Sequence, residues 1–158
     1  MLTHPFPPLY SGDSKKLILG SFPSVKSRDQ SFYYGHERNR FWQVLATLYN
    51  EPVPQTIEEK RSLVLSHDLA LWDVIASCDI TGSADSTVKN ATANDIGTLL
   101  ANTKIEKIFV NGKTAAKLYE KLILPSIGIE AIYLPSTSPA NAAFSVERLI
   151  EAWRIVRD

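Results

Sequence analysis

Four polar segments of the sequence carry most of the side chains that could do chemistry. Each follows a short apolar run: GSFPSVKS begins at Gly20, SCDITGSADS at Ser77, NGK at Asn111 and PSTSPAN at Pro135. Hydroxyl groups and free backbone amides bind phosphate oxygens well. The segments therefore predict a site for a phosphate-bearing ligand. The hydroxyl residues suited to that role are Ser24, Ser27, Ser136, Thr137 and Ser138.

Flat aromatic and amide side chains close to these segments suit the recognition of a base. Aromatic rings stack on bases, and the candidates are Phe22, Tyr33 and Tyr34. A side-chain amide both donates and accepts, so it can read a base edge or hold a water molecule. The amide candidates are Asn39, Asn111 and Asn141. Together these features suit a nucleotide unit, although the aromatics could instead cover the sheet edge as core.

Composition narrows the class of protein. The chain has 158 residues, a formal net charge of zero and 22% charged residues, which indicates a single globular domain. A balanced charge argues against long non-specific wrapping of nucleic acid but allows local contact with a few phosphates. The single cysteine, Cys78, excludes an internal disulfide and a cysteine-based zinc cluster, so we expect a cytoplasmic protein. The N-terminal residues do not resemble a signal peptide, and no apolar stretch approaches the roughly 18 residues of a membrane span.

Several common motifs are missing. The sequence has no G-x-x-x-x-G-K-[ST], no G-x-G-x-x-G and no G-x-S-x-G. Three aspartates, Asp79, Asp85 and Asp95, show no metal-site spacing and fit a solvated loop better. Of the histidines, only His36 lies within a candidate site.

The elements that must position these segments follow an α/β pattern. Apolar strands alternate with helices, which predicts a three-layer α/β/α fold with a central four-stranded parallel sheet, in one domain over residues 1–158. Because parallel strands end at a shared edge, the four polar segments should meet there. The expected strands are 16–20, 69–75, 107–110 and 131–134, and the expected helices are 39–49, 56–67, 94–100, 113–124 and 145–156.

Local signals add further expectations. Residues 1–13, which contain His4, should run along the surface as an extended lead-in. Residues 77–90 should form a long loop of the kind that is usually functional. Thr56 and Glu59 fit a capping box, and Asn94 fits a helix N-cap.

The order and placement of four motifs resemble the uracil-DNA glycosylase superfamily. The motifs are GSFPS, YYGHERNRFW, LWDVIASCDITGSADS and PSTSPAN, and the resemblance runs from Leu17 to Asn141. Within the superfamily the chain is most similar to the hypoxanthine-DNA (deoxyinosine) glycosylase branch. That resemblance implies a monomeric enzyme that flips a deaminated base out of double-stranded DNA and hydrolyses its N-glycosidic bond. It also implies no metal, no redox cofactor and no covalent lysine.

The resemblance assigns roles to individual residues. Asn39 matches the amide on which this branch depends for catalysis, and His36 is a second candidate for polarising the base. Residues 135–141 match the loop that grips the DNA backbone and fills the gap left by the flipped base. The base pocket is expected to contain Gly20, Ser21, Phe22, Pro23, Tyr33, Tyr34 and Asn111. Contacts to the DNA backbone are expected from Ser24, Ser27, Lys113, Ser136, Thr137, Ser138 and Asn141.

The chain departs from better-known uracil enzymes in both motifs. Those enzymes place an aspartate in the first motif and a histidine at the start of the second, where this chain has Phe22 or a nearby residue and Leu134. It therefore lacks the acid and histidine pair that they use. No large apolar residue lies within STSPAN, so Asn141 or Phe144 is expected to act as the wedge.

Simpler alternatives remain at each level. Asn39 could merely cap a helix that begins at Arg40, and the hydroxyl residues could make ordinary turn hydrogen bonds. The whole chain could be a nucleoside or nucleotide hydrolase, or a non-catalytic DNA- or protein-binding module. A positive rim around the site would favour DNA, and the basic residues expected there are Lys26, Arg28, Arg38, Arg40, Lys89 and Lys113.

Overall fold

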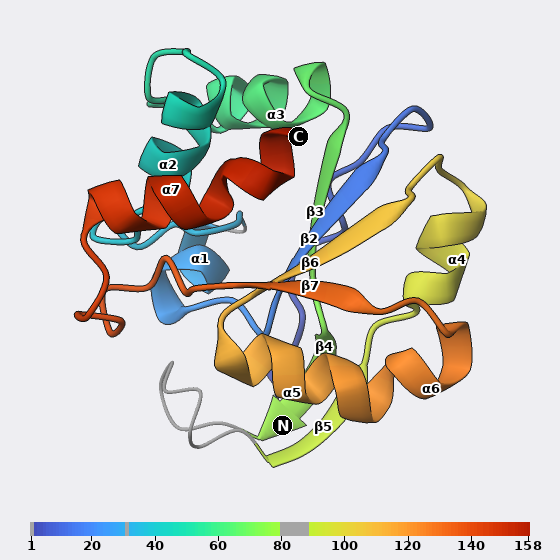
Figure 1. Cartoon of the computed structure of the whole chain (residues 1–158). Coiled ribbons are helices and arrows are strands. Elements are labelled where there is room, and N and C mark those ends of the chain that lie inside the picture. The colour runs from blue at the N-terminus through green and yellow to red at the C-terminus, as the bar shows by residue number, and fades with distance from the viewer. Residues whose placement is uncertain (1, 31, 80–88) are drawn as a thin grey trace.

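The computed structural model describes residues 2–30, 32–79 and 89–158. Its centre is a four-stranded parallel sheet with the order β3–β2–β6–β7 (Figure 1). The predicted sheet and its strand direction are confirmed. The strands are β2 (Lys16–Gly20), β3 (Leu69–Asp73), β6 (Lys107–Asn111) and β7 (Ala131–Leu134).

Apolar side chains on both faces of β2 explain its place inside the sheet. Leu17, Ile18 and Leu19 are fully buried, as expected for a strand covered on both sides. Ile18 belongs to one core cluster, and Leu17 and Leu19 belong to another. Helices therefore cover both faces, as predicted (Figure 1). The helices of the Ile18 side are α2 (Phe41–Leu48), α3 (Ile57–Ser66) and α7 (Val146–Arg157), and those of the other side are α4 (Ile96–Ala101), α5 (Lys113–Leu122) and α6 (Leu124–Ile127).

The helix termini agree only partly with the sequence signals. Thr56 caps α3 by accepting a hydrogen bond from the backbone of Glu59 at 3.1 Å, but the Glu59 carboxylate returns to Gln55 and not to Thr56. The predicted N-cap Asn94 was wrong, because Asp95 caps α4 instead. The prediction of one helix over residues 113–124 was also wrong, because the chain breaks at Ile123 before α6. A short helix that the sequence did not predict, α1 (Val25–Gln30), follows β2.

A second, antiparallel sheet contains both ends of the predicted long loop, residues 77–79 and 89–90. It consists of β1 (Leu2–Thr3), β4 (Ile75–Asp79) and β5 (Lys89–Ala93), in the order β1–β4–β5. The predicted strand 69–75 therefore ends at Asp73, and the chain changes sheets at Val74, whose amide donates to Gly20 O at 2.8 Å. The remainder of the loop, residues 80–88, lies outside the described residues.

The N-terminal segment is part of the core and not a surface lead-in. β1 pairs with β4, and Leu9 makes an isolated bridge to Leu71 of β3. Phe6 and Leu9 are buried in the cluster under α2 and α7. The expectation of a purely surface segment was therefore wrong, because the side chains of Phe6 and Leu9 extend the main core, although Tyr10 in the same segment is exposed. No helix in the described ranges is long and apolar enough to span a membrane.

Candidate active site

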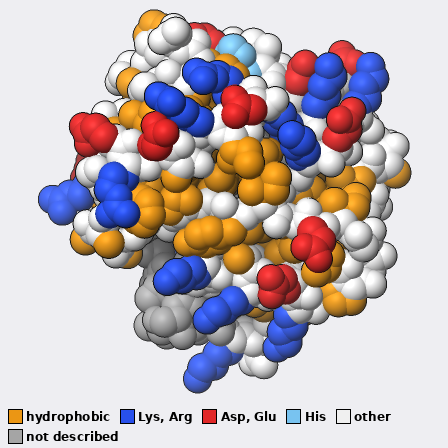
Figure 2. Space-filling model, in the orientation of Figure 1, with side chains coloured by type: hydrophobic (Ala, Val, Ile, Leu, Met, Phe, Trp, Pro, Cys, Tyr) orange, Lys and Arg blue, Asp and Glu red, His pale blue; other side chains and the backbone are white. Residues whose placement is uncertain are grey.

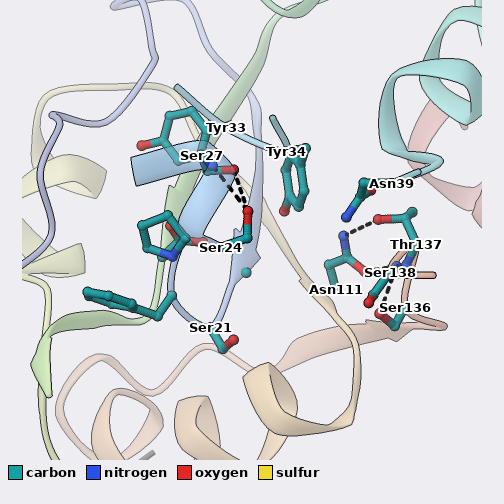
Figure 3. A pocket seen from close by; sticks show the side chains of 14 residues that line it. Ser21, Ser24, Ser27, Tyr33, Tyr34, Asn39, Asn111, Ser136, Thr137 and Ser138 are labelled. Atoms are coloured by element: carbon teal, nitrogen blue, oxygen red, sulfur yellow. Dashed lines mark hydrogen bonds between the residues drawn. The ribbon is translucent and has the colours of Figure 1, made fainter. Parts of the chain in front are cut away.

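A cavity opens at the carboxyl ends of the central strands (Figure 3). Its volume is about 120 Å³, whereas a bound water needs only about 10–15 Å³, so it can admit a ring-sized group. Three of the four polar segments meet there. Of the segment that begins at Ser77, the described residues 77–79 do not line the cavity, and the rest lies outside the described residues. The lining residues are Gly20, Ser21, Phe22, Pro23, Ser24, Ser27, Tyr33, Tyr34, Asn39, Asp73, Asn111, Ser136, Thr137 and Ser138.

Three residues expected at the site do not line this cavity. His36 lines a neighbouring cavity, which shares Tyr34 and Asn39 with the first. Lys113 is exposed at the start of α5. The amide of Asn141 donates to Ser136 O at 3.0 Å, so it braces the loop after β7.

Asn39 lies at the start of α2 and is held in one orientation. Its Oδ1 accepts a hydrogen bond from the amide of Phe41 at 2.9 Å. If Asn39 were only a helix cap, the helix was expected to begin at Arg40, but α2 begins at Phe41. With the oxygen engaged, the Nδ2 group is left to face the cavity, toward Tyr34 and Asn111 (Figure 3). The geometry thus combines a helix-capping contact with a donor that is directed at the cavity.

Asn111 holds the β7 loop against the end of β6. Its Nδ2 donates to Thr137 Oγ1 at 3.1 Å, and its Oδ1 accepts from the Thr137 amide at 3.2 Å. Thr137 is fully buried, so its geometry favours a role in holding the loop and not the predicted contact with a phosphate. Gly112 allows this close approach: it has φ of +97°, and a Cβ there would lie 3.2 Å from Ser136 Cβ.

Arg40 clamps the same loop from the other side. Its guanidinium donates to the carbonyl of Phe144, to Ser138 O at 2.7 Å and to Asn141 O at 3.1 Å. Its backbone amide donates to Thr137 O at 3.1 Å. The expectation that Arg40 belongs to a free basic rim was therefore wrong, because its donors are used inside the protein.

Ser24 and Ser27 make the turn hydrogen bonds that the simpler reading anticipated. Ser24 Oγ accepts from the Ser27 amide at 3.1 Å, across the first turn of α1. Ser27 Oγ accepts from the Gly35 amide at 2.8 Å, and Ser27 is only 2% exposed. Both side chains line the cavity while they tie α1 to the following loop.

The predicted stacking residues form the cavity wall in different ways. The ring of Tyr33 packs edge-on against Phe6 at 4.7 Å, and its hydroxyl donates to Pro7 O at 3.0 Å. The ring of Tyr34 is stacked on Phe41 with 4.0 Å between centroids. The Tyr34 hydroxyl is buried without a hydrogen-bond partner in the part of the chain that the structure describes. Its burial, and then the charge of Asp73, raise the pKa of Tyr34.

Sequence reasoning missed Asp73 and its partner His4. Asp73 ends β3 in the cavity wall, and its Oδ2 lies 2.7 Å from His4 Nε2. The side chains of His4 and Asp73 are 4% and 5% exposed. The charge of Asp73 also contributes, after burial, to a raised pKa of Tyr33. An aspartate at the end of an apolar strand was the available signal, but the expected strand ran past it to Ile75.

Comparison with known proteins agrees with this arrangement. The family model described as the uracil DNA glycosylase superfamily matches residues 7–157. A protein from Methanosarcina acetivorans named hypoxanthine DNA glycosylase is 35% identical over 158 residues, which are 99% of this chain and 98% of that protein. A protein of the same name from Methanosarcina barkeri is 33% identical over 140 residues, 86% of each chain.

A solved structure supports the same assignment. The solution NMR structure of a Methanosarcina acetivorans protein, described provisionally as a uracil DNA glycosylase, superposes with a TM-score of 0.81. It is 31% identical in sequence, and the match covers 100% of both chains. The parallel sheet, the cavity at its carboxyl edge and these matches over nearly the whole length lead to one conclusion: the chain belongs to the uracil DNA glycosylase superfamily.

Proposed function

We propose that this protein is a monofunctional DNA glycosylase that removes hypoxanthine from double-stranded DNA, acting as a monomer in the cytoplasm. The observation that carries the proposal is the Asn39 amide, whose oxygen is held by Phe41 and whose nitrogen faces the cavity. The names of the two relatives at 33% and 35% identity support the choice of base. Xanthine and uracil, which are also products of deamination, are further candidate substrates.

The proposed reaction is hydrolysis of the bond between the base and the sugar. That bond breaks through a sugar with cation-like character, and negative charge develops on the leaving base. The Asn39 Nδ2 group can donate a hydrogen bond to the base as this charge forms. Water then adds to C1′ of the sugar and loses a proton while the departing base gains one, so the products are the free base and an abasic site. Extrusion of the base costs a few kcal/mol and costs least at a mismatch, which contributes to selectivity.

The loop after β7 is the proposed contact with the DNA backbone. Asn111 and Arg40 hold this loop from two sides, so it is already in place before DNA binds. Its remaining polar side chains include the half-buried Ser136 and Ser138, next to the exposed Pro139 and Ala140. The exposed Lys113 lies at the start of the neighbouring α5. These positions are consistent with local contacts to a few phosphates by a protein of zero net charge.

The experiment uses duplexes that contain a single deoxyinosine, deoxyuridine or deoxyxanthosine, with alkali to reveal abasic sites. We expect the wild type to act on the deoxyinosine duplex. Asn39→Asp keeps an oxygen for the Phe41 amide but replaces the donor, so it should fold normally and lose roughly 10²–10³-fold in single-turnover rate. Asn39→Ala should lose the rate and, in addition, about 1 kcal/mol of stability from the missing cap.

Three results would count against the proposal. Wild-type inertness on every duplex would favour a non-catalytic binding module. Release of base from free deoxyinosine but not from the duplex would favour a nucleoside hydrolase. A wild-type rate for Asn39→Asp would show that Asn39 acts only as a helix cap.

A further inference from the structure

Asp73 is a buried carboxylate in the cavity wall that the proposed reaction does not use. Its Oδ2 is engaged by His4 at 2.7 Å. Its Oδ1 accepts no hydrogen bond from any residue that the structure describes, and Asp73 lines the cavity. Oδ1 lies against Gly20, where a Cβ would be 2.5 Å away. The absence of a side chain at Gly20 therefore leaves room for this oxygen.

The hydrogen bonds of His4 determine what Oδ1 can do. His4 Nδ1 lies 2.7 Å from the carbonyl oxygen of Phe6, and a carbonyl can only accept, so Nδ1 carries a proton. The contact between Nε2 and Oδ2 then shares a second proton. If His4 holds that proton, Asp73 is a carboxylate; if Oδ2 holds it, Oδ1 is the carbonyl oxygen of a neutral acid. In both states Oδ1 is a hydrogen-bond acceptor.

The hydroxyl of Tyr34 supplies a donor beside this acceptor. It is buried and has no partner within hydrogen-bond geometry among the described residues. It lies 3.2 Å from the point where a Gly20 Cβ would be, which is the same point that lies 2.5 Å from Asp73 Oδ1. Burial and the charge of Asp73 raise the pKa of Tyr34, so the hydroxyl keeps its proton. The Asn111 amide near its oxygen acts as a donor and offsets part of this rise in pKa, but it does not use the hydroxyl hydrogen. The cavity wall therefore presents an acceptor and a donor close together.

This pair matches the face that deamination creates on a base. Adenine carries an amino donor at C6 and a lone pair at N1. Deamination turns the amino group into a carbonyl acceptor and puts a hydrogen on N1. We propose that Asp73 Oδ1 accepts from this ring N–H while the Tyr34 hydroxyl donates to the adjacent carbonyl, so that the two residues select bases with a lactam group.

The inference rests on the proposed function and gives it a substrate class. Hypoxanthine, xanthine and uracil all carry a ring N–H beside a carbonyl. Adenine would instead direct its N1 lone pair at Asp73 Oδ1, and an unpaired buried acceptor is costly. Asp73, held by His4, thus both favours deaminated bases and rejects adenine.

The test compares deoxyinosine with deoxynebularine, whose base is unsubstituted purine and lacks both the carbonyl and the N1 hydrogen. Single-turnover excision from otherwise identical duplexes gives a preference ratio for each protein. The intrinsic lability of each base cancels when the ratio of a variant is divided by that of the wild type. Asp73→Leu should lower this ratio roughly 10- to 100-fold, the effect of losing one hydrogen bond to a charged group.

Asp73→Asn is the conservative variant. In this variant His4 still donates from Nδ1 to the Phe6 carbonyl, because a carbonyl can only accept. Its Nε2 then accepts from the Asn amide, which leaves the Asn oxygen facing the cavity. Asp73→Asn should therefore retain a preference within a few-fold of wild type. Glu120→Leu, on the exposed face of α5, removes a negative charge elsewhere and should leave the ratio unchanged.

The outcomes separate this inference from the proposed function. An unchanged ratio in Asp73→Leu, or an equal loss in Asp73→Asn and Asp73→Leu, overturns the inference while the glycosylase activity stands. If Asp73→Leu does not fold, Tyr34→Phe decides, because it keeps the stacked ring and removes only the donor to the carbonyl. An unchanged ratio in folded Tyr34→Phe then also overturns it. A wild type that excises no deaminated base refutes the proposed function itself.

Discussion

Replacement of Arg40 by methionine tests whether this residue organises the active-site loop or binds DNA. The guanidinium donates to four carbonyls of the loop, those of Thr137, Ser138, Asn141 and Phe144. Methionine retains an apolar stem but no donor. Hydrogen bonds from a charged group contribute about 1.5–3 kcal/mol each, but water can reach part of this loop and the four bonds share one group. We therefore expect the free energy of unfolding to fall by about 2–4 kcal/mol, which is less than the sum of four such bonds.

The measurement is urea and thermal unfolding, together with single-turnover excision. In a chain of this size each kcal/mol corresponds to roughly 2–4 °C in Tm, so the midpoint should fall by roughly 4–16 °C. Arg148→Met is the matched control: Arg148 belongs to α7 next to the same loop, is exposed and donates to a single carbonyl, that of Ala143 at 2.9 Å. It should lose less than about 1 kcal/mol.

The salt dependence of DNA binding provides the refutation. A residue that contacts a phosphate contributes about one to the slope of log affinity against log salt. If Arg40→Met unfolds like the wild type but lowers that slope by about one, Arg40 is a DNA contact and the clamp is wrong. If stability falls while the slope is unchanged, the clamp is supported.

Two further predictions concern backbone conformation and alkaline pH. Gly112→Ala should lower the free energy of unfolding in urea by about 1–3 kcal/mol, because Gly112 has φ of +97°. Gly12→Ala should be nearly neutral, because a Cβ there has nothing within 4 Å. Equal losses in the two variants would contradict this prediction. The pKa of Tyr33 and of Tyr34 is raised, chiefly by burial, so the folded state binds more protons above pH ~10 and stability should fall as pH rises beyond that value. Tyr33→Phe or Tyr34→Phe should make the free energy of unfolding fall less steeply at alkaline pH, whereas Tyr10→Phe on the exposed surface should not. Identical pH profiles of the unfolding free energy in all three variants would refute this explanation.

The central sheet could be predicted because its strands are locally unambiguous. The apolar run at 16–20 and the run at 131–134 became strands with the predicted bounds. The polar segments after them could be brought together from strand direction alone, and the cavity is where that argument placed it. The position of the site could therefore be predicted mainly from the parallel direction of the strands.

The second sheet and the His4–Asp73 pair could not be predicted in the same way. Ile75–Asp79 and Lys89–Ala93 are rich in small polar residues, which resemble a loop when no partner strand is known. His4 and Asp73 are 69 residues apart, and no local pattern connects them. The apolar residues Phe6 and Leu9 were a signal that the N-terminal segment is buried, but the surrounding prolines favoured a surface reading.

The location of β2 inside the sheet has a consequence for synthesis on the ribosome. Its two neighbours pair with it through Leu69 and Lys107 opposite Lys16, so both arrive long after β2 has been made. A nascent chain that stops before β6 leaves one edge of a strand with three consecutive apolar residues, Leu17 to Leu19, without a partner, which favours association between chains. We expect such stalled chains to require a chaperone until β6 emerges and the sheet can close around β2.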